Sequence, residues 1–268
     1  MEICITGYSG FVGSYIIKKL PKKFSIRKIN LRKIPILETG NYDRYLNKFN
    51  KANIIINFAS AIYPKTKHDF FINQDFPKIL ENHMKKKKKN FLLIHISTTN
   101  VLNKKIRDPY TNSKRIAEKK LLNTKSTILR LPLIIHKKKG RLHNSGNLKF
   151  FFKYLNINLL PIYPMIYPGT KFEPVTLEQL SKFTNKIIIK KKVMKVYNIS
   201  GGYTLNMWEL FEEVAKLKNK KILKINLSFL NIILPSFVKK LLGRSNGNLK
   251  HLLILNNTKF NEKKTIFK

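Results

Sequence analysis

Three glycines near the start of the chain restrict its fold more than any other feature. The segment TGYSGFVG at 6–13 follows an apolar strand pattern at Glu2–Thr6 and opens a helix. In such a turn the first glycine, Gly7, permits the tight bend, and Gly10 lets backbone N–H groups approach a pyrophosphate. Gly13 lets the helix pack on the strand, and the helix N-terminus holds the anion. The segment therefore predicts a dinucleotide site, to which we assign Gly7, Ser9, Gly10, Phe11, Val12 and Gly13.

Strand and helix patterns alternate through the first half of the chain. The predicted strands are 2–6, 26–31, 53–58, 91–97 and 127–131, and the predicted helices are 11–20, 42–49, 68–84 and 110–122. This order indicates a parallel sheet with helices on both faces. After Pro132 the rhythm loosens, with helices expected at 148–155, 177–187 and 204–217 and a strand at 195–199. We expect an α/β protein with a Rossmann-like doubly wound parallel sheet over 1–135, and a smaller α+β substrate lobe over 136–268 that is intertwined with it.

The charge of the chain is extreme, because 54 Lys and Arg face only 14 Asp and Glu, for a formal net charge of +40. Such a surface attracts nucleic acid or anionic lipid non-specifically. The lysines are spread along the whole chain, and Lys, Asn, Ile, Phe and Tyr are all residues of AT-rich codons. The one dense run, Lys85–Lys89, suits a solvated helix C-terminus. We therefore interpret the charge as compositional drift and expect no specific nucleic-acid partner.

Several classes of protein are disfavoured by what the sequence does not contain. No stretch approaches the roughly 20 apolar residues of a membrane span, and no signal-peptide pattern precedes the first strand. We therefore expect a cytoplasmic protein without membrane contact. The single cysteine, Cys4, lies within the first strand and is interpreted as a small buried hydrophobe rather than a redox group. The six histidines lack metal-ligand spacing, so no metal site is predicted.

Four later segments carry further chemistry. They are NFAS at 57–60, HISTTNV at 95–101, YTNSK at 110–114 and LRLP at 129–132. With the G-x-x-G-x-x-G turn, they make the chain resemble the extended short-chain dehydrogenases/reductases, the NAD-dependent epimerase/dehydratase family that includes nucleotide-sugar epimerases. The resemblance covers nearly the whole chain. It implies an NAD(P)-dependent enzyme that acts on a nucleotide-activated sugar.

The resemblance assigns roles to residues at the ends of the third and fourth strands. Phe58, Ala59 and Ser60 correspond to the family's motif against the cofactor, and Asn73 to a structural asparagine in the following helix. When the fourth strand is aligned on its valine, Val101, the active-site hydroxyl is Thr98. Ser97 is the alternative.

Tyr110 and Lys114 form the Tyr-x-x-x-Lys pair of the family. Residues four apart share a helix face, so the ammonium can lie close to the phenol. A free tyrosine titrates near ~10, so a base that works near neutrality needs about 4 kcal/mol of charge stabilisation. The resemblance implies that Tyr110 transfers the proton, that Lys114 lowers its pKa and holds the cofactor ribose, and that Thr98 hydrogen-bonds the reacting oxygen.

The chain departs from the family between these residues. Thr98 and Tyr110 are only 12 residues apart, about half the family's common gap, so the connecting loop is trimmed. The dehydratases carry Asp-Glu after the active-site threonine, where this chain has Thr99 and Asn100. Without that acid and base, elimination of water is not expected.

Cofactor and substrate preferences have weaker signals. Arg32 lies near the end of the second strand, where an acid would bind the ribose of NAD and an arginine suits the 2′-phosphate of NADP. We therefore expect NAD(P), with NADP favoured over NAD. Asn144 and Asn147 resemble the loop by which the nucleotide-sugar enzymes hold their substrate, and an ordinary loop is the equal alternative.

Together these patterns predict an epimerase or a ketoreductase that acts on a nucleotide sugar through Thr98, Tyr110 and Lys114. One alternative is a non-catalytic subunit that holds NADP(H), which the trimmed loop favours and the intact triad opposes. Another is an RNA-associated member of the family. The oligomeric state stays open, with a homodimer as one alternative.

Overall fold

The computed structural model of the chain describes residues 1–32, 34, 42–87, 90–124, 126–157, 162–167, 169, 171–190, 196–226 and 264–266. These residues form two compact units, and each unit draws on separate stretches of the chain. The described residues of 1–132, 177–199 and 264–266 make unit 1, and those of 133–176 and 200–226 make unit 2. Unit 1 thus includes a helix and two strands from residues 136–268, the predicted substrate lobe.

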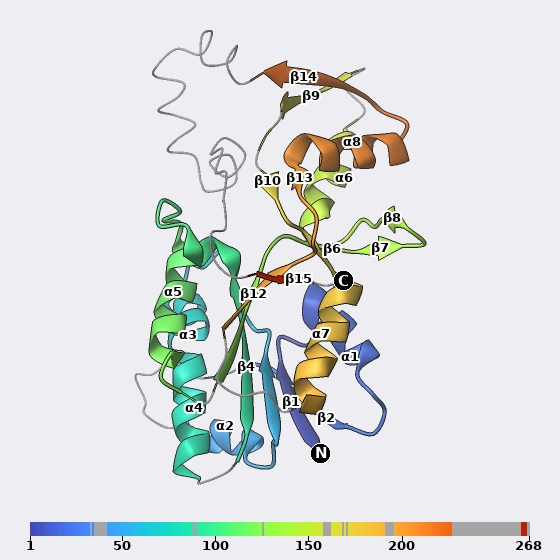
Figure 1. Cartoon of the computed structure of the whole chain (residues 1–268). Helices are drawn as coiled ribbons and strands as arrows, with labels where there is room; N and C mark the ends of the chain where they lie inside the picture. The colour runs from blue at the N-terminus through green and yellow to red at the C-terminus, as the bar shows by residue number, and fades with distance from the viewer. Residues whose placement is uncertain are drawn as a thin grey trace. The chain divides into compact units, whose positions relative to one another are not determined.

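Unit 1 is built on a seven-stranded sheet with the order β15-β12-β5-β4-β3-β1-β2 (Figure 1). From β2 to β12 every neighbouring pair of strands is parallel. The strands are β1 (Glu2–Thr6), β2 (Ser25–Ile29), β3 (Ile54–Asn57), β4 (Leu92–Thr98), β5 (Ser126–Leu131), β12 (Val196–Ser200) and β15 (Lys264–Ile266). The order runs outward from β1 in both directions, so the predicted doubly wound sheet is confirmed.

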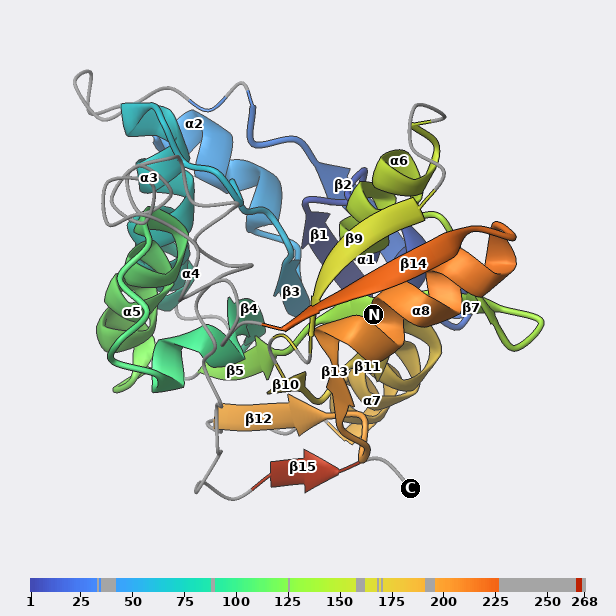
Figure 2. The ribbon, with the colours of Figure 1, turned by 90° about the horizontal axis from the view of Figure 1, so that it is seen from above.

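Helices cover both faces of this sheet, as Figures 1 and 2 show. One face carries α1 and α7, and the other carries α3, α4 and α5. The helices of unit 1 are α1 (Phe11–Lys19), α2 (Asp43–Leu46), α3 (Lys67–Gln74), α4 (Phe76–Lys86), α5 (Pro109–Leu121) and α7 (Leu177–Lys190), with short 3-10 turns η2 (Asn47–Phe49) and η3 (Thr99–Leu102). This coverage explains why β3 is a run of isoleucines, since a strand buried on both faces needs no polar alternation.

The main core of unit 1 lies between the sheet and the helices α3, α4 and α5. Cys4, Ile55, Leu93 and Ile128 of four strands pack there against aromatic side chains such as Phe76. Cys4 is fully buried, and this burial raises the pKa of its thiol to about 12. The thiol therefore behaves as a core side chain.

The predicted single helix over 68–84 is wrong, because the structure has two helices that meet at Asp75. The first, α3, begins with a capping box between Thr66 and Asp69. The second, α4, has Pro77 in its first turn. A proline has no N–H to give and clashes with the carbonyl four residues earlier, so one continuous helix cannot pass through it. The break places Asn73 in the last turn of α3.

Unit 2 is smaller and contains short strands and two helices. Its elements are β6 (Ile134–Ile135), β7 (Lys137–Lys138), β8 (Arg141–Leu142), η4 (Gly146–Leu148), α6 (Lys149–Leu155), β9 (Ile162–Tyr167), β10 (Lys171–Phe172), β11 (Val175–Thr176), β13 (Leu205–Asn206), α8 (Met207–Leu217) and β14 (Lys221–Asn226). Its own core includes Phe151, Tyr163 and Phe211. In the part of the chain that the structure describes, no helix combines the length and apolar character needed to cross a membrane.

Candidate active site

The glycine turn between β1 and α1 packs against the end of β3. Gly7 has a φ of +65°, and a Cβ on it would lie 2.5 Å from the backbone nitrogen of Ala59. A Cβ on Gly13 would lie 2.4 Å from the carbonyl oxygen of Gly7. Real side chains do not tolerate such contacts with backbone, so these two glycines let strand, turn and helix approach one another. Phe58 completes the junction, because its N–H bonds the Thr6 carbonyl at 3.2 Å.

Gly10 has different surroundings. It is the N-cap of α1, and its N–H bonds the Gly7 carbonyl at 3.1 Å. Of the described atoms, a Cβ on Gly10 would meet only the Gly7 carbonyl oxygen within 4 Å, at 3.2 Å, so the other directions around this residue are free for a ligand. Among described residues no side chain caps α1, and its first turn contains no acid. The first N–H groups of α1 and the space at Gly10 therefore suit a phosphate group.

Asn73 ties the end of β3 to α5. This buried side chain accepts hydrogen bonds from the Ser60 hydroxyl (3.0 Å) and the Ala61 N–H (2.9 Å). Its amide nitrogen donates to the Ala61 carbonyl (2.9 Å) and to the Ser113 hydroxyl (3.1 Å). All the usual partners of an asparagine are thus present, and Asn73 acts as a bridge between β3 and α5.

Tyr110 and Lys114 lie in the first two turns of α5. The helix begins at Pro109 after the cap residue Asp108, whose side chain accepts from the Thr111 N–H at 2.9 Å. The Lys114 Nζ lies 5.9 Å from the centroid of the Tyr110 ring and donates to the Ile96 carbonyl at 2.9 Å. The helix therefore brings phenol and amine to one side, as their spacing predicts.

Burial shifts the pKa values of both members of the pair. Burial lowers the pKa of Lys114 to about 7, with the nearby Glu118 opposing the shift. Burial raises the pKa of Tyr110, the hydrogen-bonded Ser60 hydroxyl lowers it, and Asp108 raises it. In the protein without a ligand, therefore, the pKa of Tyr110 lies above its ordinary value and not below it. Near neutral pH the phenol is therefore protonated, and burial makes the Lys114 amine easier to deprotonate than an exposed lysine.

Thr98 ends β4 and is the N-cap of η3. Its Oγ accepts from the Asn100 N–H at 3.3 Å, and the side chain is buried. The Thr98 oxygen accepts in this contact, so the hydroxyl proton of Thr98 stays free to be donated to another acceptor. Ser97 points to the other face of the strand, and its buried hydroxyl has no hydrogen-bond partner among the described residues.

A buried polar row next to Lys114 was not identified from the sequence. Thr6, Asn57 and His95 are register partners on β1, β3 and β4. The Thr6 hydroxyl donates to Asn57 at 2.6 Å, and Asn57 lies 3.3 Å from the Nδ1 of His95. Burial, and to a lesser extent Lys114, holds the pKa of His95 well below its usual value. A polar residue within or at the end of each of three apolar strands was the signal for this row.

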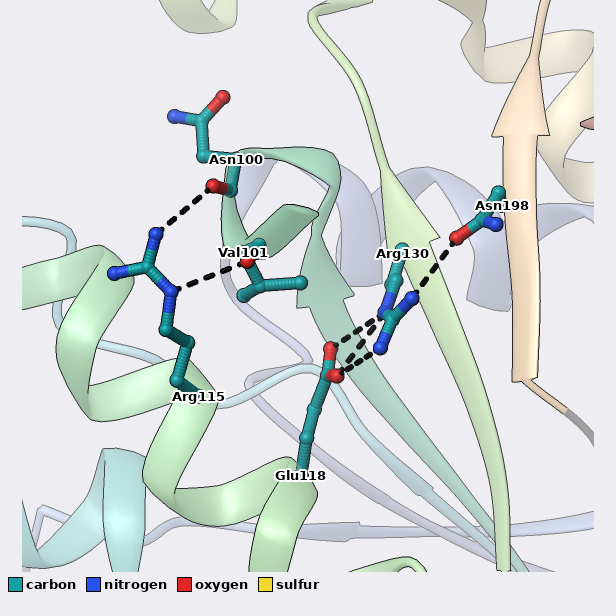
Figure 3. Close-up of polar contacts among 6 residues, drawn as sticks. All are labelled: Asn100, Val101, Arg115, Glu118, Arg130 and Asn198. Carbon is teal, nitrogen blue, oxygen red and sulfur yellow. Dashed lines mark hydrogen bonds and ion pairs between the residues drawn. The ribbon is translucent and has the colours of Figure 1, made fainter. Parts of the chain in front are cut away.

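A second polar cluster anchors the lower half of α5 (Figure 3). Arg130 of β5 binds both carboxylate oxygens of Glu118, with its Nη2 at 2.6 Å, and contacts Asn198 of β12 at 3.3 Å. Both charged side chains are largely buried. Because the two charges pair with each other, they hold α5 on the sheet and neither charge is buried without a partner.

The remaining predicted residues lie elsewhere. Arg32 is exposed just beyond β2, and its backbone N–H bonds the side chain of Asn30 at 2.9 Å. Asn144 is exposed in unit 2, between β8 and η4. The side chain of Asn147 lies outside the described part of the structure. No three His, Cys, Asp or Glu side chains of the described residues gather as metal ligands would.

Comparison with known proteins finds the same fold. No protein-family model and no curated protein matches the chain. A dTDP-4-dehydrorhamnose reductase from Clostridium acetobutylicum superposes with a TM-score of 0.66 at 18% identity, over 84% of this chain and 83% of the other. The same enzyme from Bacillus anthracis, in complex with NADP, gives 0.64 at 18% identity over 85% of both chains. A UDP-glucose 4-epimerase from Thermus thermophilus, in complex with NAD, gives 0.63 at 15% identity over 84% and 86%. The fold implied by the sequence motifs is thereby confirmed.

Proposed function

We propose that this protein is an NAD(P)-dependent ketoreductase or epimerase that acts on a nucleotide-activated sugar. The observation that carries the proposal is the placement of Tyr110 and Lys114 on one side of α5, next to the end of β4 where Thr98 lies. The glycine turn ends β1, in the same parallel sheet. In open α/β sheets ligands bind beyond the carboxyl ends of the strands, so these groups and a dinucleotide would share one edge.

The chain offers a specific set of groups to a nicotinamide dinucleotide. The open space at Gly10 and the uncapped start of α1 suit its pyrophosphate, with Ser9, Phe11 and Val12 contributing backbone. Phe58, Ala59 and Ser60 would flank it, Lys114 would hold a ribose, and Arg32 favours a 2′-phosphate. When bound, the cofactor supplies hydride transfer. Two of the superposed enzymes are described as complexes with NADP and with NAD, which supports a nicotinamide dinucleotide as the cofactor.

The proton inventory of the site favours the reductive direction. Because Tyr110 is protonated near neutral pH, it can give its phenolic proton to a carbonyl oxygen of the substrate as that oxygen gains charge. Thr98 can donate its hydroxyl proton to the same oxygen, since the Asn100 contact uses only the oxygen of Thr98. A protonated Lys114 would then stabilise the phenolate left on Tyr110. In an epimerase the same groups first accept a proton and later return it.

A nucleotide sugar is proposed as the substrate for two reasons. The superposed enzymes are named for dTDP- and UDP-sugars, and Asn144 and Asn147 stand in a loop that resembles the family's substrate loop. The dehydratase route is not proposed, because Thr99 and Asn100 replace the acid and base that it requires.

The test is a panel of UDP-, GDP- and dTDP-sugars with NAD and NADPH, followed by product chromatography. Tyr110→Phe should bind the cofactor as the wild type does and lose about 10²–10⁴-fold in turnover, the usual contribution of a positioned acid. Tyr15→Phe on α1, which also deletes one phenolic oxygen, is the matched control and should keep full turnover. Full activity in Tyr110→Phe contradicts the mechanism. A wild type that binds the cofactor and converts no sugar favours a non-catalytic, cofactor-holding protein.

A further inference from the structure

The Arg115 side chain makes several contacts with the trimmed connection between β4 and α5, two of which Figure 3 shows. Its Nε donates to the Val101 carbonyl at 3.1 Å. One terminal nitrogen, Nη1, donates to the Ile106 carbonyl and to the Asn112 side chain, both at 2.7 Å. The other, Nη2, donates to the carbonyls of Asn103 at 2.6 Å and Asn100 at 3.3 Å. Four carbonyls of one loop thus converge on a single guanidinium.

These contacts use the whole hydrogen-bonding capacity of the arginine. A guanidinium has five N–H groups, and five acceptors are present. None remains for a phosphate or sugar of a ligand, so Arg115 is not a substrate-binding arginine. Its charge instead faces carbonyl oxygens at the end of η3, where a cation is favoured by the exposed carbonyl dipoles.

Arg115 is linked to Thr98 indirectly, through hydrogen bonds of Asn100. The Asn100 carbonyl accepts from Arg115, and the Asn100 N–H donates to the Thr98 Oγ at 3.3 Å. Arg115 therefore holds one side of η3 while Thr98 caps the other. Because Arg115 stands on α5 directly after Lys114, the helix that carries Tyr110 also anchors the loop that bonds Thr98.

We propose that Arg115 is a positioning residue that fixes the Thr98 hydroxyl relative to Tyr110, an inference that rests on the proposed function of these two residues. A lysine could not replace the arginine, because its compact ammonium has three donors and cannot reach all the carbonyls that the planar guanidinium contacts.

The experiment compares Arg115→Ala, Arg115→Lys and the control Lys119→Ala, which removes an exposed cation from the same helix. Alanine is a good helix former, so α5 should persist in each. The first readout is the NMR signal of the Thr98 methyl group, assigned with Thr98→Ser, together with hydrogen exchange of residues 99–108. Both need no substrate. In Arg115→Ala the Thr98 signal should shift or split and exchange should rise, while Lys119→Ala matches the wild type.

The second readout is turnover on the sugar panel. Arg115→Ala and Arg115→Lys should lose about 10–100-fold in kcat, the scale of a small misplacement of reacting groups, with cofactor affinity unchanged. Guanidinium ion at millimolar concentration should restore part of the turnover and the Thr98 signal in Arg115→Ala, but no turnover in Tyr110→Phe.

The outcomes separate the two proposals. An unchanged Thr98 signal in Arg115→Ala overturns the positioning role whatever the wild type catalyses. A changed signal with full kcat reduces Arg115 to a structural residue and likewise overturns it. A wild type that converts no sugar contradicts the proposed function, while the methyl signal still decides whether Arg115 positions Thr98.

Discussion

Lys114 is a buried amine, and its burial should cost stability. Its pKa falls from 10.5 to about 7 on folding, which corresponds to at most about 5 kcal/mol. Between these values the unfolded chain binds more protons than the folded protein, so stability rises with pH across that window. Below the folded value both states are protonated, and the folded protein carries the full cost of the buried ammonium.

Lys114→Met should therefore stabilise the protein by about 1–3 kcal/mol in mildly acidic solution, since an apolar chain of similar length avoids that cost. The gain should shrink as pH rises and vanish above the unfolded pKa. Urea unfolding of both proteins at a series of pH values measures it. If the variant is less stable at every pH, the bond from Lys114 to the Ile96 carbonyl outweighs the burial. Turnover should be lost in either case.

Asn73 makes four hydrogen bonds in a fully buried place. Asn73→Asp keeps the shape but turns the donor nitrogen into an oxygen that faces the Ala61 carbonyl. We expect a loss of about 2–4 kcal/mol in the free energy of unfolding, because a buried carboxylate oxygen then faces a carbonyl oxygen to which the amide had donated. Asn90→Asp at an exposed position is the control and should change stability by less than about 0.5 kcal/mol. Equal effects of the two substitutions would contradict the bridging role.

At the scale of an element, the turn from β1 to α1 contains one glycine that the fold requires, Gly13, and one that the proposed cofactor binding requires, Gly10. Gly13→Ala places a Cβ against the Gly7 carbonyl, so we expect a loss of about 1–3 kcal/mol in stability. Gly10 has an extended backbone conformation that valine tolerates, and of the described atoms a Cβ there would meet only the Gly7 carbonyl oxygen within 4 Å. Gly10→Val should cost less stability than Gly13→Ala, because its Cβ meets the Gly7 carbonyl oxygen at 3.2 Å rather than 2.4 Å. It should weaken NADP binding by more than tenfold, or about 1.4 kcal/mol. Thermal unfolding and isothermal titration would show whether the two effects separate in this way.

The elements that the sequence predicted well are those with a strong local signal. The isoleucines of β3 and the three glycines before α1 have one good structural solution each. The break at Asp75 is hard to predict because an apolar helical period continues across it, and Pro77 is the only local sign of it. Ends of elements depend on capping contacts such as that of Asp108 with the Thr111 N–H, which are partly visible in sequence.

The candidate site was predictable to a smaller extent. The spacing of Tyr110 and Lys114 is local and was read correctly as one helix face. The five acceptors of Arg115 were not predictable, since four are backbone carbonyls, which any residue type presents. The raised pKa of Tyr110 also escaped, because it follows from burial by chain segments far away in the sequence.

At the scale of the whole molecule, the net charge of +40 sets how the protein meets polyanions. We expect it to bind duplex and single-stranded nucleic acid at low salt without preference for sequence. The logarithm of the affinity should fall linearly and steeply with the logarithm of salt concentration, as counterion release requires. Binding assays with unrelated competitor sequences would measure this. Affinity that survives high salt, or that competitors of other sequence do not reduce, would point to a dedicated RNA partner.

The strand order of unit 1 also bears on synthesis. β5 pairs with β12, yet 64 residues, from 132 to 195, separate the two strands along the chain. A ribosome adding roughly 5–20 residues per second needs about 3–13 seconds to deliver them. Through that interval the nascent sheet ends in an open strand edge, to which other unfinished chains can add. The yield of folded protein in a cell should therefore depend on what shields β5 while the rest of the chain is being made.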